Sequence, residues 1–160
     1  MNIIALIAGV LGAFSAPALA VAQSSNMRNL HAVAFLNGKC TQLTFAGKDG
    51  TRACVGKITN TMYKTGRTGF VFMFGDHALI TFSGADSPAR GDQATVRLDK
   101  VIFALIGTGT EPNVIPATGI CTYTNPYAGP SRINCSASTK VGKFSGAFVS
   151  DGAEPDIQRF

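Results

Sequence analysis

Four cysteines fall into two pairs with the same spacing, and this feature constrains the fold of the 160-residue chain more than any other. The pairs are Cys40 with Cys54 and Cys121 with Cys135, each fourteen positions apart. Residues 46–50 and 126–130, at the two midpoints, contain Gly, Pro and Asp residues that favour turns. Opposed residues of antiparallel strands lie at a separation that suits a disulfide. The spacing therefore predicts two local disulfides, each stapling a hairpin, although four cysteines also allow crossed pairs.

Two other uses of these cysteines fit the sequence less well. Structural zinc sites normally show cysteines two to four residues apart, and no such pair occurs here. A catalytic thiol is disfavoured because all four cysteines fall into matched pairs. Similar residues recur around the two pairs, which we attribute to shared turn chemistry rather than to an internal repeat.

The first residues of the chain have the pattern of a secretory leader. No charged side chain occurs in residues 1–20, and an apolar run from Ile3 to Phe14 leads to small residues. This pattern predicts a signal peptide over residues 1–22, cleaved between Ala22 and Gln23, with cleavage after Ala20 as the alternative. A membrane anchor is disfavoured because the apolar run is too short. We therefore expect a secreted or periplasmic protein with no transmembrane segment in the mature chain.

The mature chain reads as short strands between turn residues, with no sustained helical period. We expect a single all-β domain over 23–150, followed by a loose polar tail over 151–160. Only 14% of the residues are charged and 46% are apolar, which disfavours disorder. The predicted architecture is an antiparallel β-sandwich or small barrel of about eight or nine short strands.

Turn signals predict the connections between these strands. Asn37-Gly38 predicts a hairpin turn in a three-stranded meander over 31–59. Gly75-Asp76 predicts a two-residue turn that places Phe70, Phe72 and Phe74 on one face with His77, Leu79 and Thr81. The polar residues 83–92 and the residues 107–119 read as loops. A loss of alternation at Asp99-Lys100 predicts a bulge or a tight turn.

The later part of the chain contributes the remaining predicted strands. Residues 120–124 and 132–138 form the second stapled hairpin, and residues 143–150 form the last strand. The turn between the two stapled strands carries Tyr123, Asn125 and Tyr127. A rigid aromatic loop of this kind is a possible contact surface for a partner, and the simpler interpretation is a hydrophobic cover on the edge of the fold.

Motifs of known enzymes are missing from the sequence, so we predict no catalytic residue, no cofactor and no metal site. The nucleophile-elbow, zinc-protease, calcium-loop and phosphate-loop patterns do not occur. His77 beside Asp76 resembles a base oriented by a carboxylate, but a hairpin tip lacks the other groups that a site needs. The candidate glycosidase carboxylates are Asp86 and Asp92, or Asp151, Glu154 and Asp156, and we interpret them as solvated loop residues.

The net charge of +5 comes from scattered basic residues rather than from a cluster. We therefore expect no nucleic-acid partner and consider a protein or an anionic glycan. The favoured function is an exported non-catalytic β module that binds or scaffolds something. The alternatives are a small secreted hydrolase, whose site forms only on folding, and a secreted inhibitor or effector that uses a stapled loop.

Overall fold

The computed structural model describes residues 29–160. The predicted leader and its cleavage position between Ala22 and Gln23 lie outside this range. Within it, the chain forms strands and one short 3-10 helix, η1. Their bounds are Leu30–Phe45 (β1), Lys48–Asp49 (β2), Thr51–Ala53 (η1), Cys54–Tyr63 (β3), Arg67–Phe74 (β4), Ala78–Arg90 (β5), Gln93–Leu105 (β6), Asn113–Thr124 (β7), Arg132–Thr139 (β8), Gly142–Ser150 (β9) and Asp156–Arg159 (β10).

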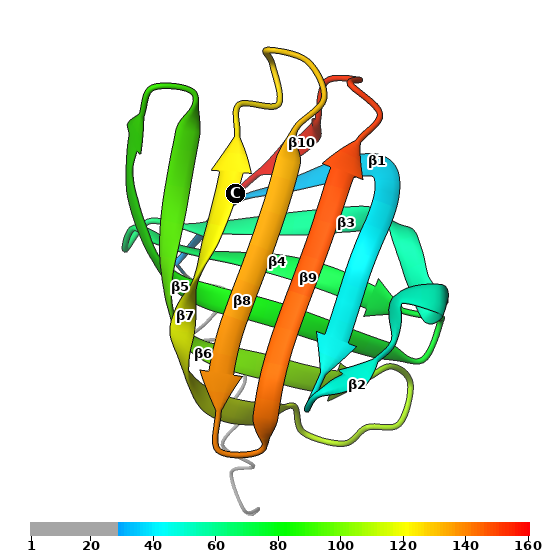
Figure 1. Cartoon of the computed structure of the whole chain (residues 1–160). Helices are drawn as coiled ribbons and strands as arrows, with labels where there is room; N and C mark the ends of the chain where they lie inside the picture. The colour runs from blue at the N-terminus through cyan, green and yellow to red at the C-terminus, as the bar shows by residue number, and fades with distance from the viewer. Residues whose placement is uncertain (1–28) are drawn as a thin grey trace, which may run out of the picture.

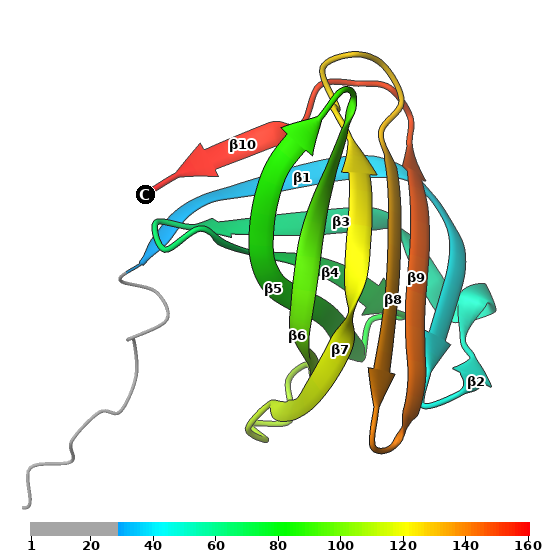
Figure 2. The ribbon, with the colours of Figure 1, turned by 60° about the vertical axis from the view of Figure 1, so that its left-hand side comes forward.

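Eight of these strands close into an antiparallel barrel (Figures 1 and 2). Strands β3 to β8 each pair with the next strand along the chain, and β1 closes the ring by pairing with β3 on one side and β9 on the other. The result is an up-and-down barrel, which leaves no long edge unpaired. The prediction of an all-β sandwich or barrel is confirmed, with β2 and β10 as strands added to the ring.

Strand β1 is one long bent strand, so the predicted hairpin turn at Asn37-Gly38 is wrong. Its first half, up to Asn37, pairs with β3, and its second half, from Gly38, pairs with β9. Gly38 lies at this change of partner, where a Cβ atom would be 2.2 Å from the carbonyl oxygen of Val149. Glycine is needed here for a close backbone approach rather than for a turn. The tight turn lies instead at Ala46-Gly47, where both φ angles are positive.

Side chains alternate between the barrel interior and the outside along each strand, as the two-residue period requires. The interior is packed with aromatic and branched side chains from neighbouring strands. The largest of them that are fully buried are Phe70, Phe72, Phe82, Phe148, Leu43, Ile58, Ile80 and Ile133. An eight-stranded barrel is just wide enough for such side chains to fill it. This packing leaves space only where the inward residues become small.

Both predicted disulfides are confirmed. Cys121 and Cys135 are directly opposed on β7 and β8, and both are buried in the barrel interior. Cys40 and Cys54 join β1 to the start of β3 and are partly buried against the same core. The two loops differ inside, because the first contains β2 and η1 whereas the second is a plain hairpin.

The predicted register of the central hairpin is wrong by one residue. Phe74 pairs with Ala78, so the turn has three residues, Gly75 to His77. The inward face of β4 therefore lies beside Ala78, Ile80 and Phe82 rather than beside His77, Leu79 and Thr81. A positive φ at Gly75 starts the turn, and His77 belongs to the turn instead of to the strand.

Two segments predicted as loops are largely strand. Strand β5 continues through the polar residues to Arg90, and β7 begins at Asn113. The predicted irregularity near Asp99 is confirmed as a bulge, because the pairing of β6 with both neighbours shifts there. The predicted strands of the second stapled hairpin match the end of β7 and most of β8, and the predicted last strand matches β9.

The C-terminal residues are not the loose tail that the sequence predicted. Residues 156–159 form β10, which pairs with Phe35 to Ala32 on the edge of β1 that β9 leaves open. Residue Ile157 is partly buried there, opposite Ala34. The alternation around one apolar residue in a polar segment was the available signal for this strand.

Candidate functional site

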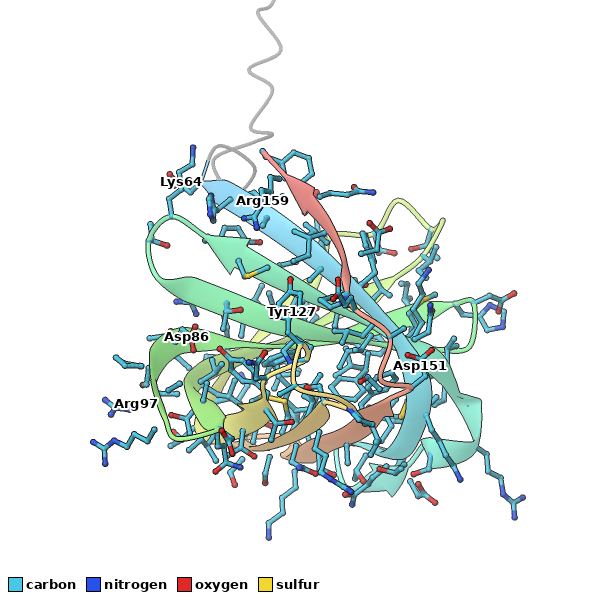
Figure 3. The ribbon with its side chains drawn as sticks, turned by 90° about the horizontal axis from the view of Figure 1, so that it is seen from above. Lys64, Asp86, Arg97, Tyr127, Asp151 and Arg159 are labelled. Atoms are coloured by element: carbon cyan, nitrogen blue, oxygen red, sulfur yellow. A yellow bond between two sulfur atoms is a disulfide. The ribbon has the colours of Figure 1, made fainter. Side chains whose placement is uncertain are left out.

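A small cavity lies at the end of the barrel where β7 and β8 are joined. Its volume is about 200 Å³ and most of its lining is apolar. Seen from above, Tyr127 lies over this opening and Asp86 lies at its side (Figure 3). The lining residues are Ala34, Leu36, Asn60, Met62, Thr68, Phe70, Asp86, Tyr123, Pro126, Tyr127, Ser131, Ile133, Pro155 and Ile157.

The cavity exists because inward side chains become small toward this end of β1. Leu36 is followed outward by Ala34 and Ala32, all of them buried. The space left by these alanines is bounded by Ile157 of β10 and by Met62 of β3. Phe70 and Ile133 line the cavity from the packed interior. A chain with larger residues on this stretch of β1 would have a filled barrel end.

Asp86 and Tyr123 form the main polar pair of the cavity. The Tyr123 hydroxyl donates to the Asp86 carboxylate, with its oxygen 3.1 and 3.2 Å from the two carboxylate oxygens. The Tyr123 ring packs edge-on against Phe70, with ring centroids 5.2 Å apart. Burial of the phenol and the nearby negative charge of Asp86 raise the pKa of Tyr123 well above its ordinary value. The phenol therefore stays a neutral donor at physiological pH.

Three further polar side chains line the cavity, and each already donates its protons to hydrogen bonds within the protein: Asn60, Thr68 and Ser131. The Asn60 amide nitrogen lies 2.9 Å from the Thr68 hydroxyl and 3.1 Å from the carbonyl oxygen of Gly69. The Thr68 hydroxyl donates to the carbonyl of Thr61, and the Ser131 hydroxyl donates to the carbonyl of Thr124. These bonds fix the side chains and leave oxygen atoms as the remaining hydrogen-bonding groups of the cavity.

The predicted contact loop contributes directly to the cavity. Tyr123 points inward from the end of β7, and Tyr127 covers the opening with 57% of its surface exposed. Asn125 acts within the loop, because its side-chain oxygen accepts a hydrogen bond from the backbone N–H of Tyr127 at 3.0 Å. This Asx-type turn positions the Tyr127 ring.

The other sequence candidates do not gather around the cavity. The His77 Nδ1 atom lies 2.6 Å from an Asp76 carboxylate oxygen, but both side chains are at least 80% exposed at the hairpin tip. Asp92, Asp151, Glu154 and Asp156 are exposed and are absent from the cavity lining. Within residues 29–160, no three side chains of the types that bind metals come close enough together to hold an ion.

A second groove is larger, at about 490 Å³, but it lies on the polar outer side of β5 and β6. Arg90, Gln93, Thr95 and Arg97 line it, and Arg97 points away from the barrel in Figure 3. Thr95 and Arg97 alternate with the buried Val96 and Leu98, which places them on the outside. An anionic glycan is one of the partners considered from the sequence. Arg90 and Arg97 are the basic side chains that this groove offers to such a ligand, and they lie on an open surface.

Apart from Tyr123 and Tyr127, the sequence singled out none of the cavity residues for this role, and Asp86, Asn60 and Ile157 are examples. Asp86 and Tyr123 are 37 positions apart in the chain. They meet because β6 lies between their strands and pairs its residue Val96 with Asp86 on β5 and its residue Ala94 with Tyr123 on β7. No local pattern marks such a pair.

Within the described range, no helix is long and apolar enough to cross a membrane. No protein-family model, curated protein or solved structure matches the chain.

Proposed function

We propose that this chain is an exported, non-catalytic binding protein that holds a small, mostly apolar ligand at the open end of its barrel. The observation that carries this proposal is the cavity of about 200 Å³ lined by Ala34, Met62, Ile133 and other apolar residues. Ligand sites are mostly apolar concave pockets with a few placed polar groups. Small eight-stranded barrels can hold one small ligand in this way.

The size of the cavity restricts the ligand to a single ring with a short substituent. A dry apolar cavity of about 150 Å³ accommodates benzene, so the present one leaves room for a few further atoms. Drug-sized ligands occupy about 300 Å³ or more and would require the Tyr127 loop to move. The predicted export agrees with the two disulfides, which persist in oxidising compartments.

The alternative of a small hydrolase has less support. Asp86 is the only acidic or basic side chain among the described residues of the lining, and these include no second group that could act as its acid or base partner. The Ser131 hydroxyl donates to a backbone carbonyl rather than to a general base. The alternative of an inhibitor or effector would use the exposed Tyr127 as a protein contact.

The test is ligand binding by the oxidised, full-length mature protein, followed by NMR with benzyl alcohol as the probe. Binding should shift the signals of cavity residues in the wild type. The Ala34→Phe variant fills the cavity and should lose these shifts, whereas Ala89→Phe adds the same side chain on an exposed strand end and should keep them. The proposal fails if benzyl alcohol produces no shifts in the cavity, or if the same shifts persist in a folded Ala34→Phe variant.

A further inference from the structure

We propose that the preferred ligand is a small organic cation, a single apolar ring that carries a protonated amine, with Asp86 as its counter-ion. This inference rests on the proposed binding function and names the ligand class of the same cavity. Four features of the cavity carry it: the direction of its hydrogen bonds, its charge, its aromatic walls and its volume.

The hydrogen bonds leave the cavity rich in acceptors and poor in donors. Tyr123, Thr68 and Ser131 each give their hydroxyl proton to a protein oxygen. The Asn60 amide nitrogen also donates within the protein, so its side-chain oxygen is the group left for a ligand. Tyr127 is the exception, because the residue is 57% exposed and no hydrogen bond of its hydroxyl occurs within residues 29–160. A ligand that donates hydrogen bonds fits this arrangement, and a ligand that only accepts them does not.

Among the described residues that line the cavity, Asp86 carries the only formal charge, which is negative in a protein of net charge +5, and Asp86 is itself exposed. Its carboxylate accepts hydrogen bonds from the Tyr123 hydroxyl and from the backbone N–H of Ser87. The described part of the chain has two ion pairs, which join Arg67 to Asp99 and His77 to Asp76. Asp86 takes part in neither of them. An ionised carboxylate has about four acceptor positions, so the position of a cation beside Asp86 is open.

Aromatic rings border the same space. Tyr123 packs on Phe70, with the two ring planes inclined by 62°, and Tyr127 covers the opening. A cation near the face of an aromatic ring is attracted by the ring quadrupole. The apolar remainder of the lining suits the ring of the ligand. The cavity volume of about 200 Å³ admits one ring and one aminomethyl group.

The experiment compares three probes of nearly equal size on the oxidised protein at neutral pH. Benzylamine is a cation, benzyl alcohol is neutral and benzoate is an anion. Benzylamine should bind about two- to fivefold more tightly than benzyl alcohol, because both probes can donate a hydrogen bond to Asp86 and only benzylamine adds an ion pair, which contributes about 0.2 to 1 kcal/mol at an exposed carboxylate. Benzoate should bind most weakly. The NMR signals that move most should include the backbone amides of Asp86 and Ser87.

Two variants with the same change of charge separate the counter-ion from general electrostatics. Asp86→Asn keeps the side-chain size and should reduce the preference for benzylamine over benzyl alcohol to about one. Glu111→Gln, in the loop between β6 and β7 at the opposite end of the barrel, should leave that preference unchanged. The selectivity of the unaltered protein tests the inference even where Asp86→Asn does not fold.

The outcomes distinguish this inference from the proposed function. If benzyl alcohol binds in the cavity but benzylamine binds no more tightly, the cation assignment is wrong and the binding function stands. The same holds if Asp86→Asn keeps the preference. If none of the three probes binds, both the ligand class and the binding function are refuted.

Discussion

The two disulfides close loops of equal length but differ in burial. Removing each of them therefore tests how much burial of the sulfur atoms adds to the stabilisation that comes from closing the loop. Each has a sequence separation of 14. The chain-entropy treatment gives about 3 kcal/mol of stabilisation for a loop of this size. On that ground alone, replacing either pair by alanines should reduce the free energy of unfolding by the same amount.

The two cysteine pairs differ in burial, so we expect them to stabilise the fold by different amounts. Cys121 and Cys135 have 0% and 4% of their surface exposed, whereas Cys40 and Cys54 are only partly buried. Each buried sulfur removed from the core costs about as much as a methylene group, about 0.8 kcal/mol, and leaves a void. We therefore expect a loss of about 3 kcal/mol for Cys40→Ala with Cys54→Ala, and of about 5 kcal/mol for Cys121→Ala with Cys135→Ala.

The assay is urea unfolding of the two double variants and the wild type without reductant, followed by far-UV circular dichroism. Gentle reduction of the wild type provides a second measurement, because thiol labelling should appear first at Cys40 and Cys54, which solvent reaches more easily. Equal losses in the two double variants, within about 0.5 kcal/mol, would refute the burial argument. No loss in either variant would refute the loop-closure argument as well.

Three further predictions concern single side chains. Gly38→Ala places a Cβ atom 2.2 Å from the carbonyl oxygen of Val149 and should lower the free energy of unfolding in urea by about 2 kcal/mol or more; a loss below about 0.5 kcal/mol would contradict the close approach. The raised pKa of Tyr123 means that its phenol stays protonated in the folded state while the unfolded phenol ionises, so stability should fall as pH rises above 10, by at most about 1.4 kcal/mol per pH unit and less with solvent screening. Tyr123→Phe should flatten this alkaline slope in urea unfolding, and an unchanged slope would exclude Tyr123 as its source. Hydrogen bonds from Thr51 lower the pKa of Asp49, so they stabilise the fold above the ordinary aspartate pKa and are lost as pH falls below it. Thr51→Val should therefore reduce the acid sensitivity of unfolding, and equal acid profiles for the two proteins would argue against this contribution.

The sequence predicted features that depend on neighbouring residues, and it failed where distant strands decide the outcome. The 14-residue cysteine spacing predicted both disulfides because the residues between each pair can form a turn. The bulge at Asp99 was visible as a loss of alternation. Asn37-Gly38 has the local signature of a hairpin, but β9 approaches there and the strand continues. Contact with a strand more than 100 residues away leaves no local pattern.

The polar stretch of β5 and the cavity illustrate the same limit. Residues near the end of a barrel strand face solvent on more than one side, so the mostly exposed Ala85 to Arg90 has the composition of a loop. The predicted contact loop contains Tyr123 and Tyr127, which line the cavity, and its role as a contact surface stays a prediction. Asp86 was interpreted as a solvated carboxylate and is exposed in the structure, but its contact with Tyr123 could not be predicted, because it depends on the register of three strands.

The seam between β1 and β9 has a consequence for the chain while it is being made. Gly38 pairs with Ser150, so residues 38–44 have no partner on that side until the final strands have been synthesised. An unpaired strand edge is a template for pairing with another molecule. Incomplete chains should therefore associate through the unpaired edge of β1. A chaperone that binds the early part of the chain would prevent this association until β9 pairs with β1 and closes the barrel.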